Sequence, residues 1–505
     1  MQTLLKLVKS QWILIIIFSV VIFFQLQSRG RLKHHIAPDT GGYTSIVKAP
    51  FGAEWLQKVR TVGYPIFLIV SEKIASVEDI PVMHFLFFVV SVCLFSLALQ
   101  TLGVSALCNA IICLCLLKSK IFIFNPHVVP DVVACAAAIA AAGCTLALMK
   151  PTAHKGWWFG LAASVCYSYQ LKPVYLCMIP FAIIGIIIGR YLYERFHSED
   201  FQTNYQRLAI GVVAVAVIPF LGFCTLRYFV VDHFGIVAFG GYSAAGVGGC
   251  LLEQEDVAAL PTDLQPLAQE IIDRRNNPEV RLQGGRKTTQ WQPVVDREKS
   301  LRINYENFVD QYDFVLYWAT LRASREKLTG LPKGKAGKTF DIVVNQRLSR
   351  LSHLIFKRHR EDYAYLIGNS FLYSFQEISV TFRAAYRLLR WGAILFVIRL
   401  LVVFVAKKRY GIPSQFNKKQ YTLASLIGGT ALLFFLGNIG VISFVEVPYF
   451  RYLCAAVSLL PAAAVAFLFA DAETIIATIS RYREQTKNSR LQNTEDFSTE
   501  QRMAA

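Results

Sequence analysis

Ten long apolar runs constrain the fold of this 505-residue chain more than any other feature. A helix needs about 20 apolar residues to cross the hydrocarbon core of a bilayer. The runs are, in chain order, Leu4–Leu26, Ile80–Leu102, Val104–Phe124, Asp131–Met149, Trp157–Leu171, Val174–Tyr191, Leu208–Val231, Leu388–Ala406, Tyr421–Phe444 and Tyr452–Ala470. Only 17% of the residues are charged, against about 25% in an average soluble domain. We therefore predict an all-α polytopic membrane protein with about ten transmembrane helices, and we exclude a soluble enzyme and a disordered chain.

The charge distribution orients these spans. Lys and Arg number 52 against 34 Asp and Glu, a formal net charge of +18. The long connection from Asp232 to Arg387 is nearly neutral, so the excess is not a basic nucleic-acid-binding domain. Most basic residues of the short segments fall on the side of the N-terminus, which predicts that both termini are cytoplasmic. The first outer segment is the exception, because Arg29, Arg31 and Lys33 break the positive-inside rule.

The spans divide the chain into four parts. Residues 1–231 are predicted to form about seven spans, with an outer segment, 27–79, that carries the catalytic candidates. Residues 232–387 are predicted to form an extracytoplasmic helical loop domain, residues 388–471 about three spans, and residues 472–505 a polar cytoplasmic tail that is frayed after Arg481.

Helical spacing of apolar residues predicts the elements of the outer loop. The expected helices are Pro261–Arg275, with Thr262 as its cap, Leu301–Leu328 and Phe340–Arg360. The glycine-rich stretch Gly240–Gly249 is expected to be a flexible exit from the seventh span.

Asp39, just after the first span, is the first candidate for chemistry. A carboxylate in a cleft of low dielectric can have its pKa raised toward that of a useful general base. The structural alternative is that Asp39 caps a helix that begins near Thr40.

Three basic residues at the outer ends of spans are candidates for binding a phosphate. Arg60 could hold a phosphate through two parallel hydrogen bonds, or could extend to water as an interfacial arginine. Arg451, beside Glu446, is either a lipid-headgroup anchor or a ligand for an anionic lipid. Lys172 lies between two spans, where a charge avoids most of the cost of the bilayer centre.

Asp131 opens the fourth span, four residues after His127. Two such side chains can bind a metal ion, but a carboxylate at a helix start also interacts favourably with the helix dipole.

Taken together, these segments resemble the GT-C superfamily of integral-membrane glycosyltransferases, which includes aminoarabinose transferases of lipid A and protein O-mannosyltransferases. Four features carry the resemblance: Pro38-Asp39 followed by Tyr43; Arg60-Thr61-Val62-Gly63-Tyr64-Pro65; Asp131 at the start of a span; and Glu446 to Tyr452 followed by Pro461. Val62 replaces a proline that is usual in the family, and Asp39 has no second acid in a D-x-D pair.

The resemblance implies sugar transfer, with inversion, from a polyprenyl-phosphate donor on the extracytoplasmic face. Asp39 would be the general base, and Arg60, Lys172 and Arg451 would stabilise the departing phosphate. Asp131, Tyr43, Tyr64 and Glu446 would position the acceptor or the catalytic loop. The acceptor would be a glycan, a lipid or a protein. A divalent metal is possible as cofactor, although no metal ligands are assigned, and a bacterial inner membrane is the expected location.

Two other functions are compatible with many spans and a large outer loop. A polysaccharide polymerase or O-antigen ligase would use a diphosphate-linked glycan as its donor. A transporter or flippase for an anionic lipid or sugar predicts charged residues within the spans and an inverted repeat, and the apolar runs are nearly free of charge.

Overall fold

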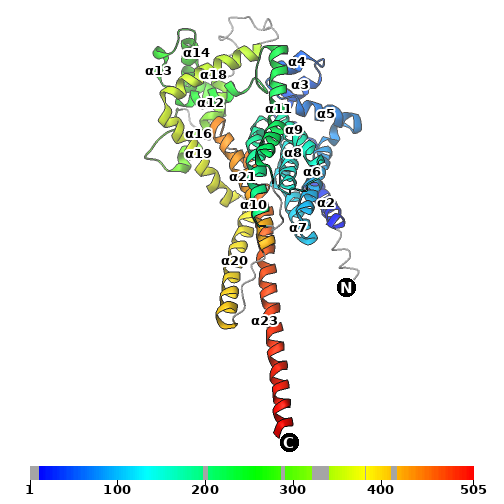
Figure 1. The fold of residues 1–505 in the computed structure, drawn as a ribbon. Coiled ribbons are helices and arrows are strands. Elements are labelled where there is room, and N and C mark those ends of the chain that lie inside the picture. The colour runs from blue at the N-terminus through cyan, green and yellow to red at the C-terminus, as the bar shows by residue number, and fades with distance from the viewer. Residues whose placement is uncertain are drawn as a thin grey trace.

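The computed structural model describes residues 11–196, 203–285, 290–320, 340–381, 383–410, 418–447 and 449–504, and these residues form an almost entirely helical structure (Figure 1). The helices of the N-terminal part are α2 (Gln11–Ser28), α3 (Thr40–Val47), α4 (Ala53–Gln57), α5 (Gly63–Ile74), α6 (Ile80–Leu102), α7 (Ala106–Leu117), α8 (Asp131–Leu148), α9 (Gly156–Leu171), α10 (Met178–Phe196) and α11 (Tyr205–Val231). The outer loop contributes α12 (Gly240–Leu251), α13 (Gln254–Ala259), α14 (Gln265–Asn276), α15 (Pro278–Gln283), α16 (Leu301–Phe314), the π-helix η4 (Val315–Thr320), α18 (Phe340–Arg358) and α19 (Arg360–Thr381). The chain ends with α20 (Arg383–Tyr410), α21 (Lys418–Val445), α22 (Phe450–Ala456) and α23 (Leu460–Ala504).

Eight segments of the described chain are long and apolar enough to cross a membrane, and each matches a predicted run. They are Gln11–Ser28, Val77–Leu102, Ala106–Phe124, Asp131–Leu148, Pro173–Phe196, Tyr205–Val231, Lys418–Val445 and Phe450–Thr486. This supports a multi-pass membrane protein. The other two predicted runs lie in α9 and α20, and their crossing of the membrane stays a prediction.

Contacts at the helix ends fix the direction of α9. Asp131, the first residue of α8, pairs with Lys172, which directly follows α9. At the far end of α8, the Leu148 carbonyl accepts a hydrogen bond from Arg190, near the end of α10. Helices α8 and α10 therefore run in the same direction, and α9 returns the chain between them. With 16 residues, α9 spans only about 24 Å, so it is short for a bilayer crossing.

Helix α8 lies at the centre of the bundle, because all 18 of its residues are buried. Alanine dominates its sequence, and small side chains let neighbouring helices approach closely where water does not drive association.

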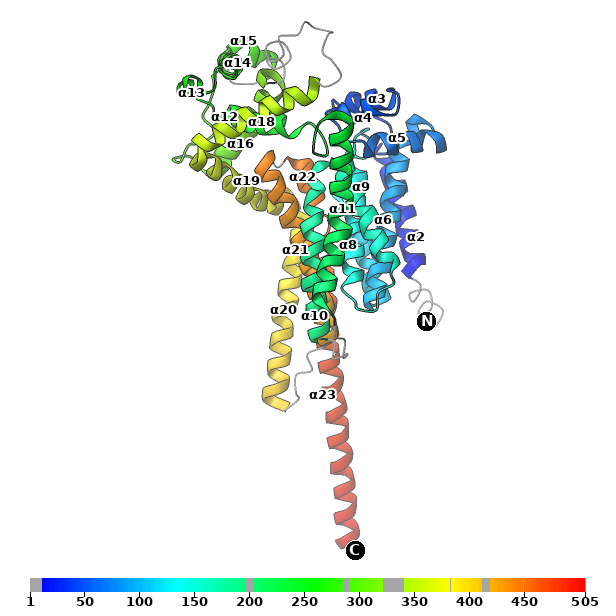
Figure 2. The same ribbon diagram turned by 45° about the horizontal axis from the view of Figure 1, so that its top comes forward.

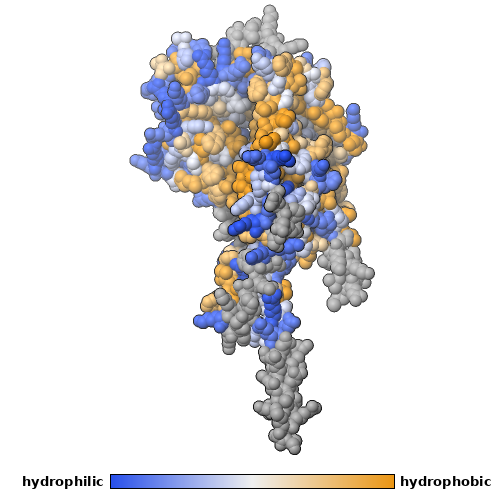
Figure 3. All heavy atoms as spheres, in the orientation of Figure 1, coloured by the Kyte–Doolittle hydropathy of each residue, from blue (hydrophilic) through white to orange (hydrophobic). Residues whose placement is uncertain are grey.

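The surface of the bundle is apolar where a membrane would contact it. On α11, Ile210, Ile218 and Phe229 are 70%, 63% and 79% exposed. Figure 3 shows hydrophobic side chains over the upper part of α11 and hydrophilic side chains over the region of α13 and α14. An apolar surface of this extent indicates contact with lipid.

The two predicted outer segments lie at the same end of the bundle. Figure 2 shows α3, α4 and α5 at this end together with α12 to α19, whereas α2 begins and α23 ends at the other end. That residues 27–79 and 232–387 lie on one side of the membrane stays a prediction. Which side faces the cytoplasm stays a prediction.

The outer loop forms its own hydrophobic core, as its helical spacing predicts. The predicted helix Phe340–Arg360 is confirmed as α18. The helix predicted at Pro261–Arg275 is α14, but it begins at Gln265, so the prediction that Thr262 is its cap is wrong. Of the predicted helix Leu301–Leu328, residues 301–320 form α16 and η4, and residues 321–328 lie outside the described residues.

The prediction of a flexible exit at Gly240–Gly249 is wrong. These residues form α12, a buried helix at the centre of the outer core. A Cβ at Gly241 would lie 2.1 Å from the carbonyl oxygen of Asn345 on α18. The glycines therefore allow close packing of helices rather than flexibility.

The predicted last span is divided, and the predicted frayed tail is wrong. Helix α22 ends at Ala456, and α23 begins at Leu460 and continues as one helix to Ala504. Polar residues after the last apolar run therefore extend a helix whose first turns are already packed in the bundle.

A buried ion pair joins the last three long helices. Arg399 of α20 lies 3.3 Å from Asp471 of α23, and the Tyr421 hydroxyl of α21 also donates to this carboxylate. The Arg399 and Asp471 side chains are 7% and 3% exposed. Because Arg399 lies in the predicted span Leu388–Ala406, this span is not free of buried charge.

We expect Asp471→Ala to destabilise the bundle by about 3–5 kcal/mol, because it leaves the Arg399 guanidinium buried without its carboxylate. Thermal unfolding of the full chain in detergent measures the effect. The double variant Arg399→Met, Asp471→Leu should recover most of the loss, since apolar side chains can replace a buried pair. If the single variant unfolds like the parent, the pair does not stabilise the packing of α20, α21 and α23.

Candidate active site

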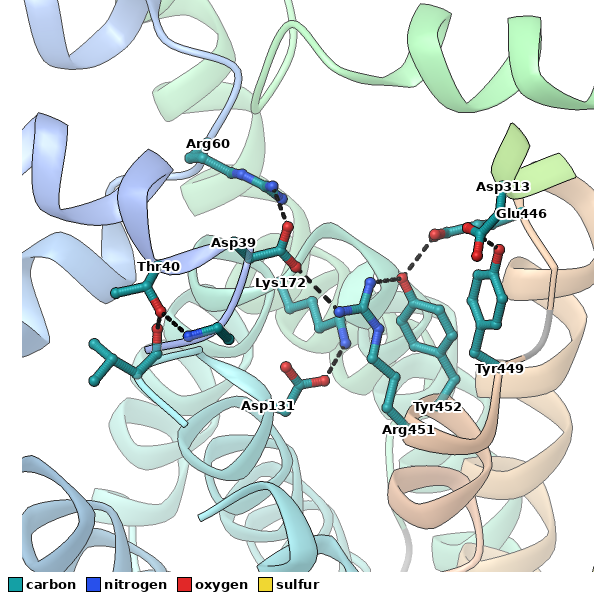
Figure 4. A network of polar contacts seen from close by, with 12 residues as sticks. Asp39, Thr40, Arg60, Asp131, Lys172, Asp313, Glu446, Tyr449, Arg451 and Tyr452 are labelled. Carbon is teal, nitrogen blue, oxygen red and sulfur yellow. Dashed lines mark hydrogen bonds and ion pairs between the residues drawn. The ribbon is translucent and has the colours of Figure 1, made fainter. Parts of the chain in front are cut away.

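Asp39 lies between two arginines at the outer end of the bundle (Figure 4). Its Oδ1 is 2.6 Å from Nη2 of Arg60, and its Oδ2 is 3.1 Å from Nη1 of Arg451. The three side chains come from the segment before α3, the segment before α5 and the start of α22. They are 20%, 22% and 29% exposed, so these ion pairs are largely shielded from solvent.

A second ion pair lies beside the first. Nζ of Lys172 is 2.5 Å from Oδ1 of Asp131 and 4.0 Å from the centre of the Tyr452 ring. The Tyr452 hydroxyl donates to Oε2 of Glu446 at 2.7 Å. The structure therefore brings together the predicted residues Asp39, Arg60, Asp131, Lys172, Glu446 and Arg451 in one polar network.

A cavity of about 670 Å³ opens beside this network. Four carboxylates line it, whereas Arg451 is the one basic Lys or Arg side chain among its described lining residues. The lining comprises Ala37, Pro38, Asp39, Phe124, His127, Val129, Asp131, Asp313, Leu316, Tyr317, Glu446, Tyr449, Phe450 and Arg451. Arg60 and Lys172 do not line it and instead pair with two of the carboxylates that do.

The segment before α3 is held by Thr40. Its Oγ1 accepts a hydrogen bond from the Ala37 amide at 2.9 Å and donates to the Val128 carbonyl at 3.1 Å. Asp39 occupies the N-cap position of α3, but its side chain makes no capping hydrogen bond. Its carboxylate is therefore directed to the two arginines, and the capping alternative fails.

Packing against the end of α9 positions Arg60. The Thr61 hydroxyl donates to the Leu171 carbonyl at 3.2 Å, and a Cβ on Gly63 would lie 2.6 Å from the Gln170 carbonyl. The Arg60 guanidinium also lies 5.3 Å from the centre of the Tyr43 ring. These contacts direct Arg60 to Asp39 rather than outward to water, so the interfacial alternative fails too.

The two predicted tyrosines support the site from behind and do not line the cavity. Tyr43 and Tyr64 are buried with ring centres 5.0 Å apart. The Tyr64 hydroxyl lies 3.0 Å from Nε2 of His84. Neither tyrosine is placed to contact an acceptor in the cavity, and a role in positioning the loop stays a prediction.

The prediction of a raised pKa for Asp39 is wrong for the unliganded site. Burial raises the pKa of this carboxyl, but the guanidinium groups of Arg60 and Arg451 outweigh burial and hold it below its ordinary value. Burial raises the pKa of Glu446 above its ordinary value, with Arg451 opposing the rise. Of these two carboxylates on the cavity, Glu446 is thus the one whose pKa moves toward neutrality.

Three polar residues of the cavity were not predicted from the sequence. Asp313, at the end of α16, accepts a hydrogen bond of 2.6 Å from the Tyr449 hydroxyl, and Tyr317 lies in η4. Asp313 and Tyr317 belong to the outer loop, and no local pattern indicates that they face the membrane bundle. Tyr449 falls within the segment Glu446–Tyr452 that carries the resemblance, and this was the one available signal.

His127 lines the cavity without a metal cluster around it. In the described part of the chain, no group of three or more His, Cys, Asp or Glu side chains could hold a metal ion. Lys172 instead occupies the position beside Asp131.

Arg29 and Arg31, which break the positive-inside rule, lie apart from Asp39. They line a separate cavity between α2 and the end of α7. Their closeness to Asp39 in sequence therefore does not bring them to its cavity.

No protein-family model matches the chain, and no curated protein matches it. Two crystal structures of ArnT from Cupriavidus metallidurans are similar. The one bound to undecaprenyl phosphate has 14% sequence identity and a TM-score of 0.32, over 93% of this chain and 77% of that chain. The apo structure has 13% identity and a TM-score of 0.30, over 88% and 77%.

We expect Gly63→Ala to displace α5 from α9, because its Cβ would meet backbone atoms that have no freedom to rotate away. Such overpacking costs about 1–3 kcal/mol, and thermal unfolding measures it. Gly41→Ala is the matched control, since a Cβ there has nothing within 4 Å. Equal unfolding temperatures for the two variants would contradict the close approach at Gly63.

Proposed function

We propose that this chain is a GT-C-type membrane glycosyltransferase that moves a sugar from a polyprenyl-phosphate donor to an acceptor at the outer end of its bundle. The observation that carries the proposal is that Asp39 and Arg451 line one cavity among apolar helices, with Arg60 paired to the same Asp39 carboxylate. A lipid-linked substrate needs such a place, where a phosphate at the membrane surface meets cations and a carboxylate.

The proposed reaction is a single displacement with inversion. An acceptor hydroxyl or amine attacks the anomeric carbon, the bond from that carbon to the phosphate oxygen breaks, and the polyprenyl phosphate leaves with the bonding electrons. The base takes the proton of the acceptor. Negative charge grows on the departing phosphate in the transition state, so fixed cations accelerate the reaction.

Donor binding requires an exchange of partners in this site. Arg60 pairs with the Asp39 carboxylate from the side away from the cavity, and Arg451 pairs with the same carboxylate. A phosphate that enters the cavity must compete with Asp39 for these guanidinium groups. As the arginines turn to the phosphate, Asp39 loses the interactions that lower its pKa and gains a neighbouring negative charge. Both changes make the carboxylate a better base.

Glu446 is the second carboxylate that this chemistry can use. It lines the cavity, its pKa is raised, and it accepts a hydrogen bond from Tyr452. We assign it to acceptor positioning, with Asp39 as the base.

The ligase and transporter alternatives differ from this proposal in the donor and in the chemistry. A ligase would favour a diphosphate-linked glycan over a monophosphate sugar in the same cavity. A transporter would move its lipid without breaking the sugar–phosphate bond. The buried pair of Arg399 and Asp471 removes one sequence argument against a transporter, yet these residues lie away from the cavity and pair with each other.

We expect Asp39→Asn to bind a polyprenyl-phosphate sugar at least as tightly as the parent, because an amide competes less for the arginines. Sugar transfer should fall about 10²–10⁴-fold, the usual contribution of a general base.

Arg60→Ala should weaken donor binding roughly 10–100-fold through loss of a charge-assisted hydrogen bond. Binding and release of sugar are followed with purified protein and a panel of donors. Exposed Arg302 offers a control, as Arg302→Ala.

Full transfer by Asp39→Asn would remove Asp39 as the base. Unchanged donor affinity in Arg60→Ala would remove its phosphate role. Donor binding by both variants and by the parent, with no sugar released from any donor, would favour the transporter.

The pH profile of kcat/KM separates the two carboxylates. Because the pKa of Asp39 is lowered and that of Glu446 is raised, the acidic limb should follow Glu446 and lie above the ordinary range of a glutamate. Activity falls as Glu446 is protonated, because the neutral acid holds the acceptor less firmly than the carboxylate does. Glu446→Gln should move the limb to lower pH, whereas an unmoved limb would assign it to another group.

A further inference from the structure

A second cavity of about 650 Å³ lies between the outer ends of α2 and α7. It shares no described lining residue with the cavity beside Asp39. The lining comprises Ile22, Gln25, Leu26, Arg29, Arg31, Leu117, Lys118, Ser119, Lys120, Phe122 and Ile123.

Four cationic side chains line this cavity, and no acidic residue is among its described lining residues. Arg29 and Arg31 follow α2, and Lys118 and Lys120 follow α7. Two chain segments, about 90 residues apart, thus bring like charges to one cavity, and an anion bound there would be attracted to both segments. Arg29 and Arg31 are also among the residues that break the positive-inside rule.

The remaining wall is apolar. Ile22, Leu26, Leu117 and Phe122 are 3%, 8%, 0% and 4% exposed, so they form a fixed floor. Beside them, Val20, Val21 and Phe24 of α2 are 49%, 57% and 61% exposed on the apolar surface of the bundle. The cavity therefore joins a cationic rim to a surface that contacts lipid chains.

The rim is held in place by bonds to its own wall. Nη1 of Arg31 donates to the Ile123 carbonyl at 2.9 Å, and the Arg31 carbonyl accepts from Nδ2 of Asn125 at 3.0 Å. Oγ of Ser119 lies 3.2 Å from Oγ of Ser458, which joins this wall to the break between α22 and α23. These contacts preorganise the cations rather than leaving them on free loops.

We infer that this cavity binds the phosphate head of an anionic membrane lipid, with the lipid chains along α2 and the apolar floor. The cations match the phosphate. No acid is among the described residues that line this cavity, whereas four carboxylates line the one beside Asp39. An apolar floor next to exposed α2 side chains suits a lipid better than free phosphate. The inference does not rest on the proposed sugar transfer.

The test uses the full chain in nanodiscs of phosphatidylcholine, titrated with phosphatidylglycerol and read by native mass spectrometry and thermal unfolding. Arg29→Gln with Lys118→Gln removes two exposed rim cations and leaves the Arg31 bonds intact. We expect roughly tenfold weaker binding of phosphatidylglycerol. Lys33→Gln with Lys48→Gln makes the same charge change at exposed residues off the cavity and should bind like the parent.

Equal losses in both double variants, or no loss in either, would overturn the site, because binding would then follow overall charge. A second experiment adds inorganic phosphate as a competitor of the bound lipid. Displacement of the lipid by phosphate at equal concentration would overturn the lipid assignment and leave a simple anion site. Arg60→Ala should retain full lipid binding, and its loss in that variant would place the lipid at the Asp39 cavity instead.

Discussion

The pairing of Asp39 with Arg60 and Arg451 is the interaction on which the outer end of this molecule depends. It joins the segment after α2, the segment before α5 and the start of α22. Asp39 and Arg451 are 412 positions apart in the sequence. A charge that is largely buried must have a partner. The three segments therefore cannot separate without exposing or neutralising these groups, and the cavity beside them is held open by the same contacts.

This pairing sets the arrangement of charged side chains around the cavity. Carboxylates line the cavity, while Arg60 and Lys172 pair with two of these carboxylates without lining the cavity themselves. Asp39 pairs with Arg60 and Arg451, and Asp131 pairs with Lys172, so Asp39 is a poor base in this arrangement. A phosphate changes this by exchanging one anion for another at the arginines. Under the proposed function, donor binding is the event that prepares the base, so the enzyme would not deprotonate an acceptor before its donor is present.

The sequence predicts the parts of this structure that depend on local composition. Apolar runs locate the spans, and residues at span ends on one side, such as Asp39, Arg60, Lys172 and Arg451, are predicted to share a surface and do meet. The direction of the Asp39 pKa shift could not be predicted, because it depends on how closely two arginines from distant segments approach. Asp313 and Tyr317 escaped notice since the fold of the outer loop, rather than its local pattern, brings them to the cavity.

The glycine content of Gly240–Gly249 led to a wrong prediction for a related reason. Gly240–Gly249 has the composition of a flexible segment, but its role is set by Asn345 on α18, about 100 residues later. Arg29 and Arg31 show that closeness in sequence does not imply a shared site. They are close to Asp39 in sequence, yet the turn after α2 directs them to the end of α7. Spacing along a chain predicts shared surfaces only where the chain continues in the same direction.

A structure of the full chain with a bound polyprenyl phosphate tests the central claim most directly. The account predicts the phosphate within hydrogen-bond distance of Arg60 and Arg451, with at least one of the two Asp39 ion pairs opened and the freed carboxylate facing the cavity. A phosphate bound elsewhere, with both Asp39 pairs intact, would contradict it.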